Sequence, residues 1–387
     1  MNWDDIIVDA AATDTGMRRS NNQDSHTIVH ASKAETWKQR GHVFMVADGM
    51  GAHAVGELAS KLACDNIPHN YIKARVGPPA EAIVKAYKEV GVLIHGKATA
   101  NKDFQGMGTT ASTLILLPAG AMIAHIGDSR VYRVRQGRID QLSFDHSLAW
   151  ELVKRGLLPA DKASKAVPRN VITRSLGPDP NIEVDIEGPW PVEQGDVFLL
   201  CSDGLSGPLE DHEMGAFAGN FHPKDACRYM IHLANLRGGL DNITVVLARI
   251  GPWVDPDSAA DAPAMADGPR PDAAKKNGWI KNLSGLIGKK KGPEAPAEEE
   301  HRYRSCECPI SEELVDSLAE LVRKIQAVAI EQTWPVEWPV LAARRRQAGA
   351  AREAGRLRLA LRDLGESIEM LGTAGRIHRK MGASNGG

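Results

Sequence analysis

Short apolar runs alternate with amphipathic helical patterns along the first 250 residues of the chain. Six runs have strand length, are rich in Val, Ile or Leu, and are bounded by Gly, Pro, Asp or Asn. They are HVFMVAD (42–48), STLILLP (112–118), MIAHIGDS (122–129), RVYRVRQGRIDQLS (130–143), DVFLLCSD (196–203) and NITVVLARI (242–250). The Gln-Gly pair at 136–137 predicts a hairpin within the fourth run. Residues 56–72 and 79–99 have apolar positions three to four apart, as in helices packed on a sheet. The pattern predicts an α+β fold with largely antiparallel sheets.

A different pattern follows residue 250. Residues 251–309 are rich in Pro, Ala, Gly, Asp and Lys, which is typical of a flexible linker. Residues 310–375 contain two seams of apolar side chains at four-three spacing, separated by the helix-breaking TWPVEWPV (333–340). This predicts a helical hairpin or coiled-coil-like segment, with a disordered tail at 376–387. We expect the seams to pack on each other, on a second chain or on a target protein.

Composition and charge narrow the class of protein. The chain has 387 residues, 43% of them hydrophobic and 25% charged, with a formal net charge of −2, so no nucleic-acid partner is expected. The arginines at 344–346 favour a solvated basic face over a nucleic-acid surface. The N-terminus has no basic signal-peptide region, and the most apolar stretch is broken by Pro118 and Gly120, so no transmembrane segment is expected. Five cysteines without a disulfide framework fit a reducing compartment, and we expect a cytoplasmic protein.

Acidic residues stand at the ends of the apolar runs, beside glycine or another small residue. They are Asp24, Asp48, Asp128, Asp203 and Asp241. Carboxylates brought together at one sheet edge repel each other unless cations lie between them, and oxygen ligands suit Mg²⁺ or Mn²⁺. Two such ions form a hydrolytic centre for phosphoesters, which also needs a cationic group for the phosphate. Arg19 is the leading candidate for that group and Arg18 the competing one.

Seven stretches containing these residues occur in a recognisable order over about residues 8–250. They are TDTGMRRSNNQDS, VADGMGAHAVGELAS, GMGTTASTLIL, AHIGDSRVYRVRQGRIDQLSFDHS, RNVITRSLG, LLCSDGLSGPL and GGLDNITVV. The set resembles the metal-dependent protein phosphatases, the protein phosphatase 2C family, in its bacterial form. The resemblance implies a β-sandwich of two antiparallel sheets flanked by helices, with metals at one end. It places the phosphatase domain at residues 1–250, with a flap at about 145–180.

The resemblance also implies roles for individual residues. Asp48 would bridge two metal ions, the Gly49 carbonyl would bind the second ion, and Asp203 with Asp241 would complete the first. Asp24 would act through a coordinated water molecule. Asp128 matches the residue implicated in a third, weaker metal, and Arg19 would hold the substrate phosphate.

Some assignments stay open on the sequence. Ala52 replaces a glycine usual in the family, and Gln23 stands where many members have Glu; neither substitution is interpreted as loss of activity. His53 either donates a proton to the leaving group or orders water. Arg174 either contacts substrate or forms a structural salt bridge, and His146 is at least as well explained by a structural role.

The predicted function is a Mg²⁺/Mn²⁺-dependent serine/threonine phosphoprotein phosphatase that acts in signal transduction through metal-activated water. Its partners would be phosphoserine and phosphothreonine proteins, the substrates of a bacterial serine/threonine kinase. The alternative is a phosphatase-like binding or scaffold module that acts through its helical C-terminal region. In either case the helical tail is a candidate for a protein–protein contact.

Overall fold

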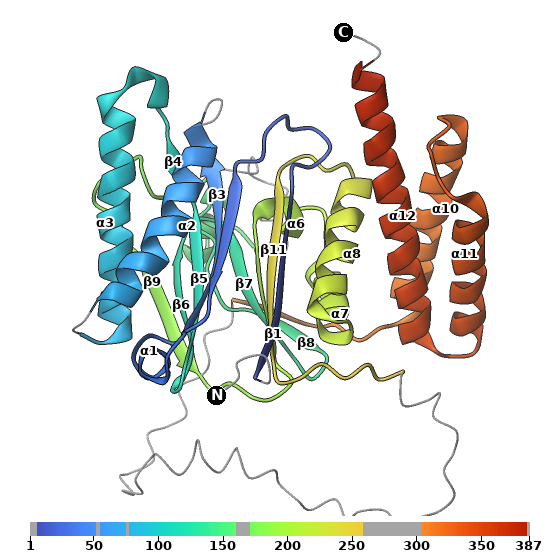
Figure 1. The fold of residues 1–387 in the computed structure, drawn as a ribbon, viewed down its shortest axis with the longest axis horizontal. Coiled ribbons are helices and arrows are strands. Elements are labelled where there is room, and N and C mark those ends of the chain that lie inside the picture. Colours follow the sequence, from blue (N-terminus) through green and yellow to red (C-terminus); the bar gives the residue numbers. More distant parts are fainter. Residues whose placement is uncertain (1–5, 52–54, 75–76, 160–170, 258–302, 385–387) are drawn as a thin grey trace, which may run out of the picture. The chain divides into compact units, whose positions relative to one another are not determined.

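Two antiparallel sheets face each other in the structure, a computed structural model that describes residues 6–51, 55–74, 77–159, 171–257 and 303–384 (Figure 1). The first sheet has the spatial order β1 (Ile7–Asp14), β11 (Ile243–Ile250), β10 (Val197–Cys201), β7 (Arg130–Arg135), β8 (Arg138–Gln141) and β12 (Arg304–Glu307). The second has the order β2 (Asp24–Val29), β3 (His42–Met50), β5 (Ala111–Leu117), β6 (Gly120–Ile126) and β9 (Asp185–Trp190), with β4 (Gly108–Thr109) paired to β3.

The sequence of β3 explains why its sheet is covered on both faces. Side chains alternate between the two faces of a strand. Phe44 and Val46 are fully buried in the core between the sheets, whereas Val43, Met45 and Ala47 are fully buried in the core beneath the helices. Because both faces are apolar, neither could face water, and the strand must lie inside a layered structure.

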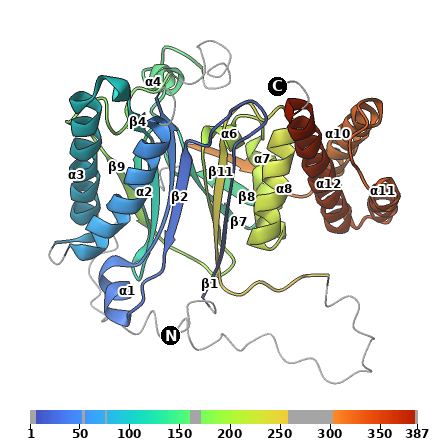
Figure 2. The same ribbon diagram turned by 45° about the horizontal axis from the view of Figure 1, so that its top comes forward.

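Helices cover the outer face of each sheet (Figures 1 and 2). α2 (Val55–Lys73) and α3 (Pro79–Ala100) pack on the second sheet, and α7 (Asp211–Asn220) and α8 (Pro223–Leu236) pack on the first. The shorter helices are α1 (Ala34–Arg40), the 3₁₀-helix η2 (Lys102–Phe104), α4 (Leu148–Lys154) and α6 (Asp203–Ser206). The predicted sandwich with flanking helices is confirmed. Of the predicted flap, α4 is described, and residues 160–170 lie outside the described residues.

The C-terminal region forms three helices, so the predicted two-helix hairpin is corrected. They are α10 (Glu312–Glu331), α11 (Trp338–Glu353) and α12 (Leu357–Ser384). Pro335 lies between α10 and α11, and Pro339 lies in the first turn of α11, where a missing N–H is tolerated. Gly355, whose φ of 71° is unfavourable for other residues, separates α11 from α12. The expected disorder from residue 376 is also wrong for 376–384, which continue α12.

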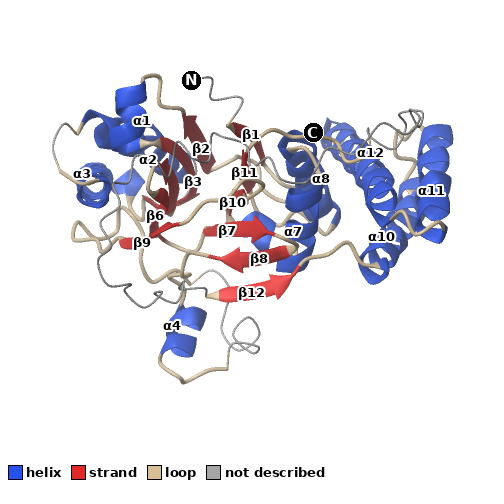
Figure 3. Cartoon of the chain, turned by 90° about the horizontal axis from the view of Figure 1, so that it is seen from below, coloured by secondary structure: helices blue, strands red, loops and turns tan. Residues whose placement is uncertain are grey.

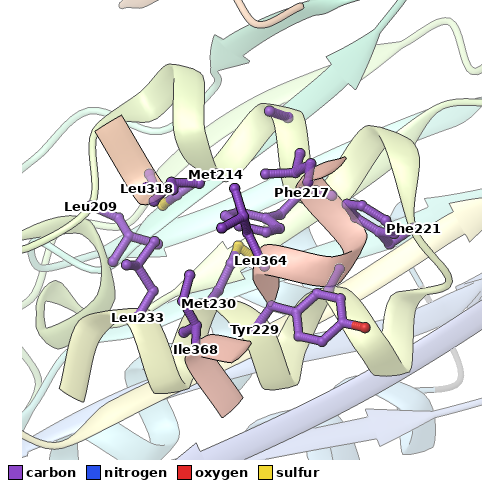
Figure 4. Close-up of a cluster of buried hydrophobic side chains, with 14 of the residues drawn as sticks. Leu209, Met214, Phe217, Phe221, Tyr229, Met230, Leu233, Leu318, Leu364 and Ile368 are labelled. Carbon is purple, nitrogen blue, oxygen red and sulfur yellow. The ribbon is translucent and has the colours of Figure 1, made fainter. Parts of the chain in front are cut away.

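The apolar seam of α12 packs against α8 of the same chain. Leu364 and Ile368 lie beside the Tyr229 and Met230 side chains in one continuous buried cluster (Figure 4). Gly365 allows α12 to approach α8 closely, because a Cβ at this position would lie only 2.7 Å from the Tyr229 ring. We expected the apolar seams to pack on each other, on a second chain or on a target protein. In the structure the seam of α12 also packs on α8 of the same chain, which was not among these expectations.

The range expected to be linker contains a strand. β12 pairs antiparallel with β8, with Arg304 opposite Gln141 and Glu307 opposite Arg138, and so extends the first sheet by one edge strand (Figure 3). Residues 258–302 lie outside the described residues, so the domain boundary near residue 250 stays a prediction. Among the described residues, no helix combines the length and apolar character needed to cross a membrane.

Candidate active site

The five carboxylates predicted to converge come from neighbouring strand ends. Asp24 begins β2 and lies opposite Asp48 of β3 in the antiparallel register. Asp128 lies two residues after β6, Asp203 begins α6 two residues after β10, and Asp241 lies two residues before β11. Their charges act on one another, as the pKa shifts below show, so the structure brings all five together.

Hydroxyl groups on neighbouring strands fix the two paired aspartates. The Ser202 Oγ donates a 2.7 Å hydrogen bond to Asp24 Oδ2. The backbone N–H of Asp48 donates to Thr110 Oγ1 at 2.8 Å, and the Thr110 N–H donates to the Asp48 carbonyl at 2.9 Å. The first contact holds the carboxylate of Asp24 and the other two hold the backbone of Asp48, which leaves carboxylate oxygens of both residues for a ligand.

Burial and mutual repulsion make these carboxylates difficult to ionise together. Burial, together with the charges of Asp203 and Asp241, raises the pKa of Asp24 to about 7. Burial and the charges of the surrounding aspartates raise the pKa of Asp48 well above its ordinary value. Burial and the Asp203 charge raise the pKa of Asp128 to about 8, and burial with the Asp241 charge raises that of Asp203. A cation between them would remove this repulsion.

The oxygen atoms at this site fit hard divalent cations. Oδ1 of Asp24 and Oδ1 of Asp203 are buried and accept no hydrogen bond, an arrangement that is costly unless a ligand occupies the space. Among the described residues, no set of three or more His, Cys, Asp or Glu side chains is already arranged around one point as ligands of a single ion. The all-oxygen donor set suits Mg²⁺ or Mn²⁺ rather than zinc.

Gly49 is needed for packing next to these carboxylates. A Cβ at this position would lie 2.1 Å from the Gly56 carbonyl oxygen of α2 and 2.5 Å from the Gln23 carbonyl oxygen. Its N–H donates to that Gln23 oxygen at 3.1 Å. The sequence suggested that glycine lets a backbone oxygen reach a metal; the structure shows that it also lets the first turn of α2 approach the end of β3.

Arg19 lies beside the carboxylate cluster. Its Nη2 donates to Asp241 Oδ2 at 2.7 Å, and its side chain is 52% exposed. The hydrogen bond to Asp241 and the charges of Asp48 and Asp203 raise the pKa of Arg19. Arg18 is also exposed, and its backbone N–H donates to the Gly239 carbonyl. The contacts favour Arg19 as the cation at the mouth of the site.

Arg174 and His146 form a structural cluster around Asp185. Arg174 Nη1 donates to Asp185 Oδ1 at 2.8 Å, and His146 Nε2 lies 3.0 Å from Asp185 Oδ2. His146 Nδ1 accepts the Gly127 N–H at 3.0 Å, so Nε2 carries the proton that it shares with Asp185. The contact with Asp185 favours the salt-bridge alternative for Arg174. The hydrogen bond from Gly127 to His146 holds the turn that precedes Asp128. His53 lies outside the described residues.

Sequence reasoning missed several supporting side chains. Asn242 ties three segments together: its Oδ1 accepts the Gln23 N–H at 2.8 Å, and its Nδ2 donates to the Thr15 and Asn21 carbonyls at 2.9 Å each. Ser202 and Thr110 are the other such residues. Each lies within a motif quoted above. Ser202 and Asn242 directly neighbour Asp203 and Asp241 in the sequence, which was the available signal, whereas Thr110 has no aspartate beside it.

Comparisons with known proteins identify the family of this chain. The family model described as protein phosphatase 2C matches residues 17–235. The chain is similar to a putative protein phosphatase 2C-type of Streptococcus pyogenes, with 36% identity over 241 residues, which covers 61% of this chain and 95% of that protein. It is similar to protein phosphatase PhpP of Streptococcus pneumoniae, with 34% identity over 243 residues that cover 62% of this chain and 95% of the relative.

Solved structures show the same likeness. The serine/threonine phosphatase of S. agalactiae superposes with a TM-score of 0.57 at 32% identity, covering 63% of this chain and 99% of that one. The catalytic domain of the phosphatase PstP, in complex with two manganese ions, has a TM-score of 0.54 at 30% identity, with 64% and 99% covered.

The fold is that of a metal-dependent phosphatase. Because the family model covers more than half of its length, the chain belongs to the protein phosphatase 2C family. This confirms the predicted class of enzyme, a metal-dependent serine/threonine protein phosphatase. The helices from Glu312 onward lie beyond the residues that the family model matches.

Proposed function

We propose that this chain removes phosphate from phosphoserine and phosphothreonine side chains of proteins, at the site formed by the five aspartates. One observation carries the proposal: buried carboxylates that raise one another's pKa, two of them with an unpaired buried oxygen, lie beside an exposed arginine. When bound, divalent ions supply an activated water nucleophile and positive charge for the phosphoryl oxygens.

The chain's own residues would hold those ions and the substrate. We assign Asp48 to both core ions, the Gly49 carbonyl to one, and Asp203 with Asp241 to the other. Asp24, fixed by its hydrogen bond from Ser202, would hold a water molecule.

Arg19 would bind the substrate phosphate. The 52% exposure of its side chain leaves it accessible to a phosphoprotein, and a guanidinium can donate two parallel hydrogen bonds to phosphate. Its ion pair with Asp241 would hold it at the mouth of the site until substrate arrives. His53 remains a prediction as a proton donor or water-ordering group.

A third, weaker ion is proposed at Asp128. Its pKa is raised mainly by burial and by Asp203, which supports a position next to the two core ions. Asp145 is another carboxylate whose charge raises the pKa of Asp128, but it is already paired with Arg130 at 2.7 Å. That pairing leaves Asp128 as the acidic group available for another cation.

The substrates would be proteins phosphorylated by a bacterial serine/threonine kinase, and the setting would be the cytoplasm. All five cysteines of the chain are free thiols, which supports a reducing compartment. A protein contact through the C-terminal helices stays a prediction.

Phosphopeptide hydrolysis tests the proposal. Matched peptides carrying phosphoserine, phosphothreonine or phosphotyrosine should be assayed for phosphate release in Mn²⁺ and after chelation. We expect release from the first two peptides in Mn²⁺ and none with chelator. Equal release with chelator, or a preference for phosphotyrosine, would contradict it.

A further inference from the structure

The C-terminal helix reaches the loop that carries Arg19. Arg376 Nη1 lies 2.5 Å from Asp14 Oδ2, at the end of β1. One turn further along α12, Arg379 Nη1 donates to the Gly16 carbonyl at 3.3 Å. Figure 2 shows the C-terminal end of α12 at the same end of the molecule as the loop that follows β1. Two arginines from outside the family match therefore contact residues just before the site.

Asp14 organises the turn that these arginines contact. Its Oδ1 accepts the Gly16 N–H at 2.9 Å and the Asn235 Nδ2 at 3.0 Å, while Oδ2 faces Arg376. The Asp14 side chain is only 9% exposed. A mostly buried carboxylate that lost its cation would keep an unbalanced charge, and the turn around it would loosen.

The turn is in direct contact with the catalytic loops. Gly16 has a φ of 78°, and a Cβ there would lie 2.1 Å from the Asp241 carbonyl oxygen. The Met17 N–H donates to the Gly239 carbonyl at 2.7 Å. Two residues later, Arg19 forms its 2.7 Å ion pair with Asp241. The position of Gly16 thus fixes how Arg19 and Asp241 meet.

We propose that Arg376 and Arg379 are positioning residues for phosphate binding, acting through Asp14 and Gly16 on Arg19. The inference rests on the proposed role of Arg19 in holding the substrate phosphate. It makes α12 a working part of this phosphatase, and any ligand or partner that displaced the end of α12 would weaken substrate binding.

Steady-state kinetics on the full-length, Mn²⁺-loaded enzyme with p-nitrophenyl phosphate test the inference. Arg376→Gln should raise KM about three- to tenfold with a smaller change in kcat, because the ground-state phosphate contact is misplaced. Arg376→Lys keeps the charge and should recover much of the loss. The matched control is Arg352→Gln: Arg352 is likewise 35% exposed and pairs with Asp316 at 2.6 Å, but within the helical bundle. It should leave KM unchanged.

A double-mutant cycle with Arg19→Ala separates positioning from general damage. In the Arg19→Ala background, Arg376→Gln should add little further rise in KM. An equal rise in KM from Arg376→Gln in both backgrounds, or a rise no larger than that from Arg352→Gln, would overturn this inference but leave the proposed phosphate role of Arg19 standing. If Arg19→Ala itself left KM unchanged, the proposed phosphate role of Arg19 would fall and this inference with it. Should Arg376→Gln fold poorly, Arg379→Gln, which removes only the exposed contact to Gly16, must show the same KM effect for the inference to stand.

Discussion

Replacing Ile368 with alanine tests whether the C-terminal helices share a core with the catalytic part of the chain. Ile368 is fully buried where α12 meets α8. The change removes three carbon groups, worth about 0.8 kcal/mol each in transfer free energy. A cavity adds roughly another 1 kcal/mol, which gives a total loss of about 3 kcal/mol in the free energy of unfolding.

The matched control is Ile330→Ala in α10. Ile330 is 56% exposed, so the same chemical change should cost well under about 1 kcal/mol. Urea unfolding of both variants and the wild type, followed by tryptophan fluorescence and by phosphatase activity, measures the difference. Equal losses for the two variants would refute the packing of α12 on α8, because Ile368 lies buried where these two helices meet and Ile330 does not.

Three further changes probe the site and the core. Asp203→Asn should lower kcat about a hundredfold or more at modest Mn²⁺ by removing a charged metal ligand; near wild-type turnover would contradict the assignment. Arg19→Ala should mainly raise KM and Arg18→Ala should not, so a larger defect in the latter would move the phosphate role to Arg18. Burial lowers the pKa of His125 to about 3, well below its ordinary value of 6.5. Below pH 6.5 protonation of this imidazole therefore favours the unfolded chain, and the free energy of unfolding falls as pH falls. Between pH 6 and 4 the wild type should lose roughly 1 kcal/mol per pH unit more than His125→Asn in urea unfolding, and parallel pH curves would rule this out.

The main strands and the acidic site could be predicted because their signals are local. Asp48, Asp128, Asp203 and Asp241 each stand at or next to a predicted apolar run, so the periodicity that locates the strand also locates the carboxylate near its end. Asp24 is different, because it begins β2, which is not among the six predicted runs. The hairpin at Gln136 and Gly137 was likewise predictable, since both residues adopt positive φ, as such turns require.

The position of the C-terminal region could not be predicted because its contacts are distant in sequence. An apolar seam shows that α12 is buried on one face, but not that α8, more than a hundred residues earlier, covers it. β12 has only four residues, without a strong strand pattern, and exists through its pairing with β8. The role of Arg174 was ambiguous for a different reason: Asp185 is only 11 residues away, but charge alone does not show that the two side chains pair.

We propose that the aspartate cluster holds the catalytic metal ions, and calorimetric titration of chelator-treated protein with Mn²⁺, for the wild type and for Asp48→Asn, measures this binding. We expect two core ions for the wild type and loss of at least one of them in the variant, because Asp48 is assigned to both. If both proteins bound the same number of ions with the same affinity, the aspartate cluster would not be the metal site.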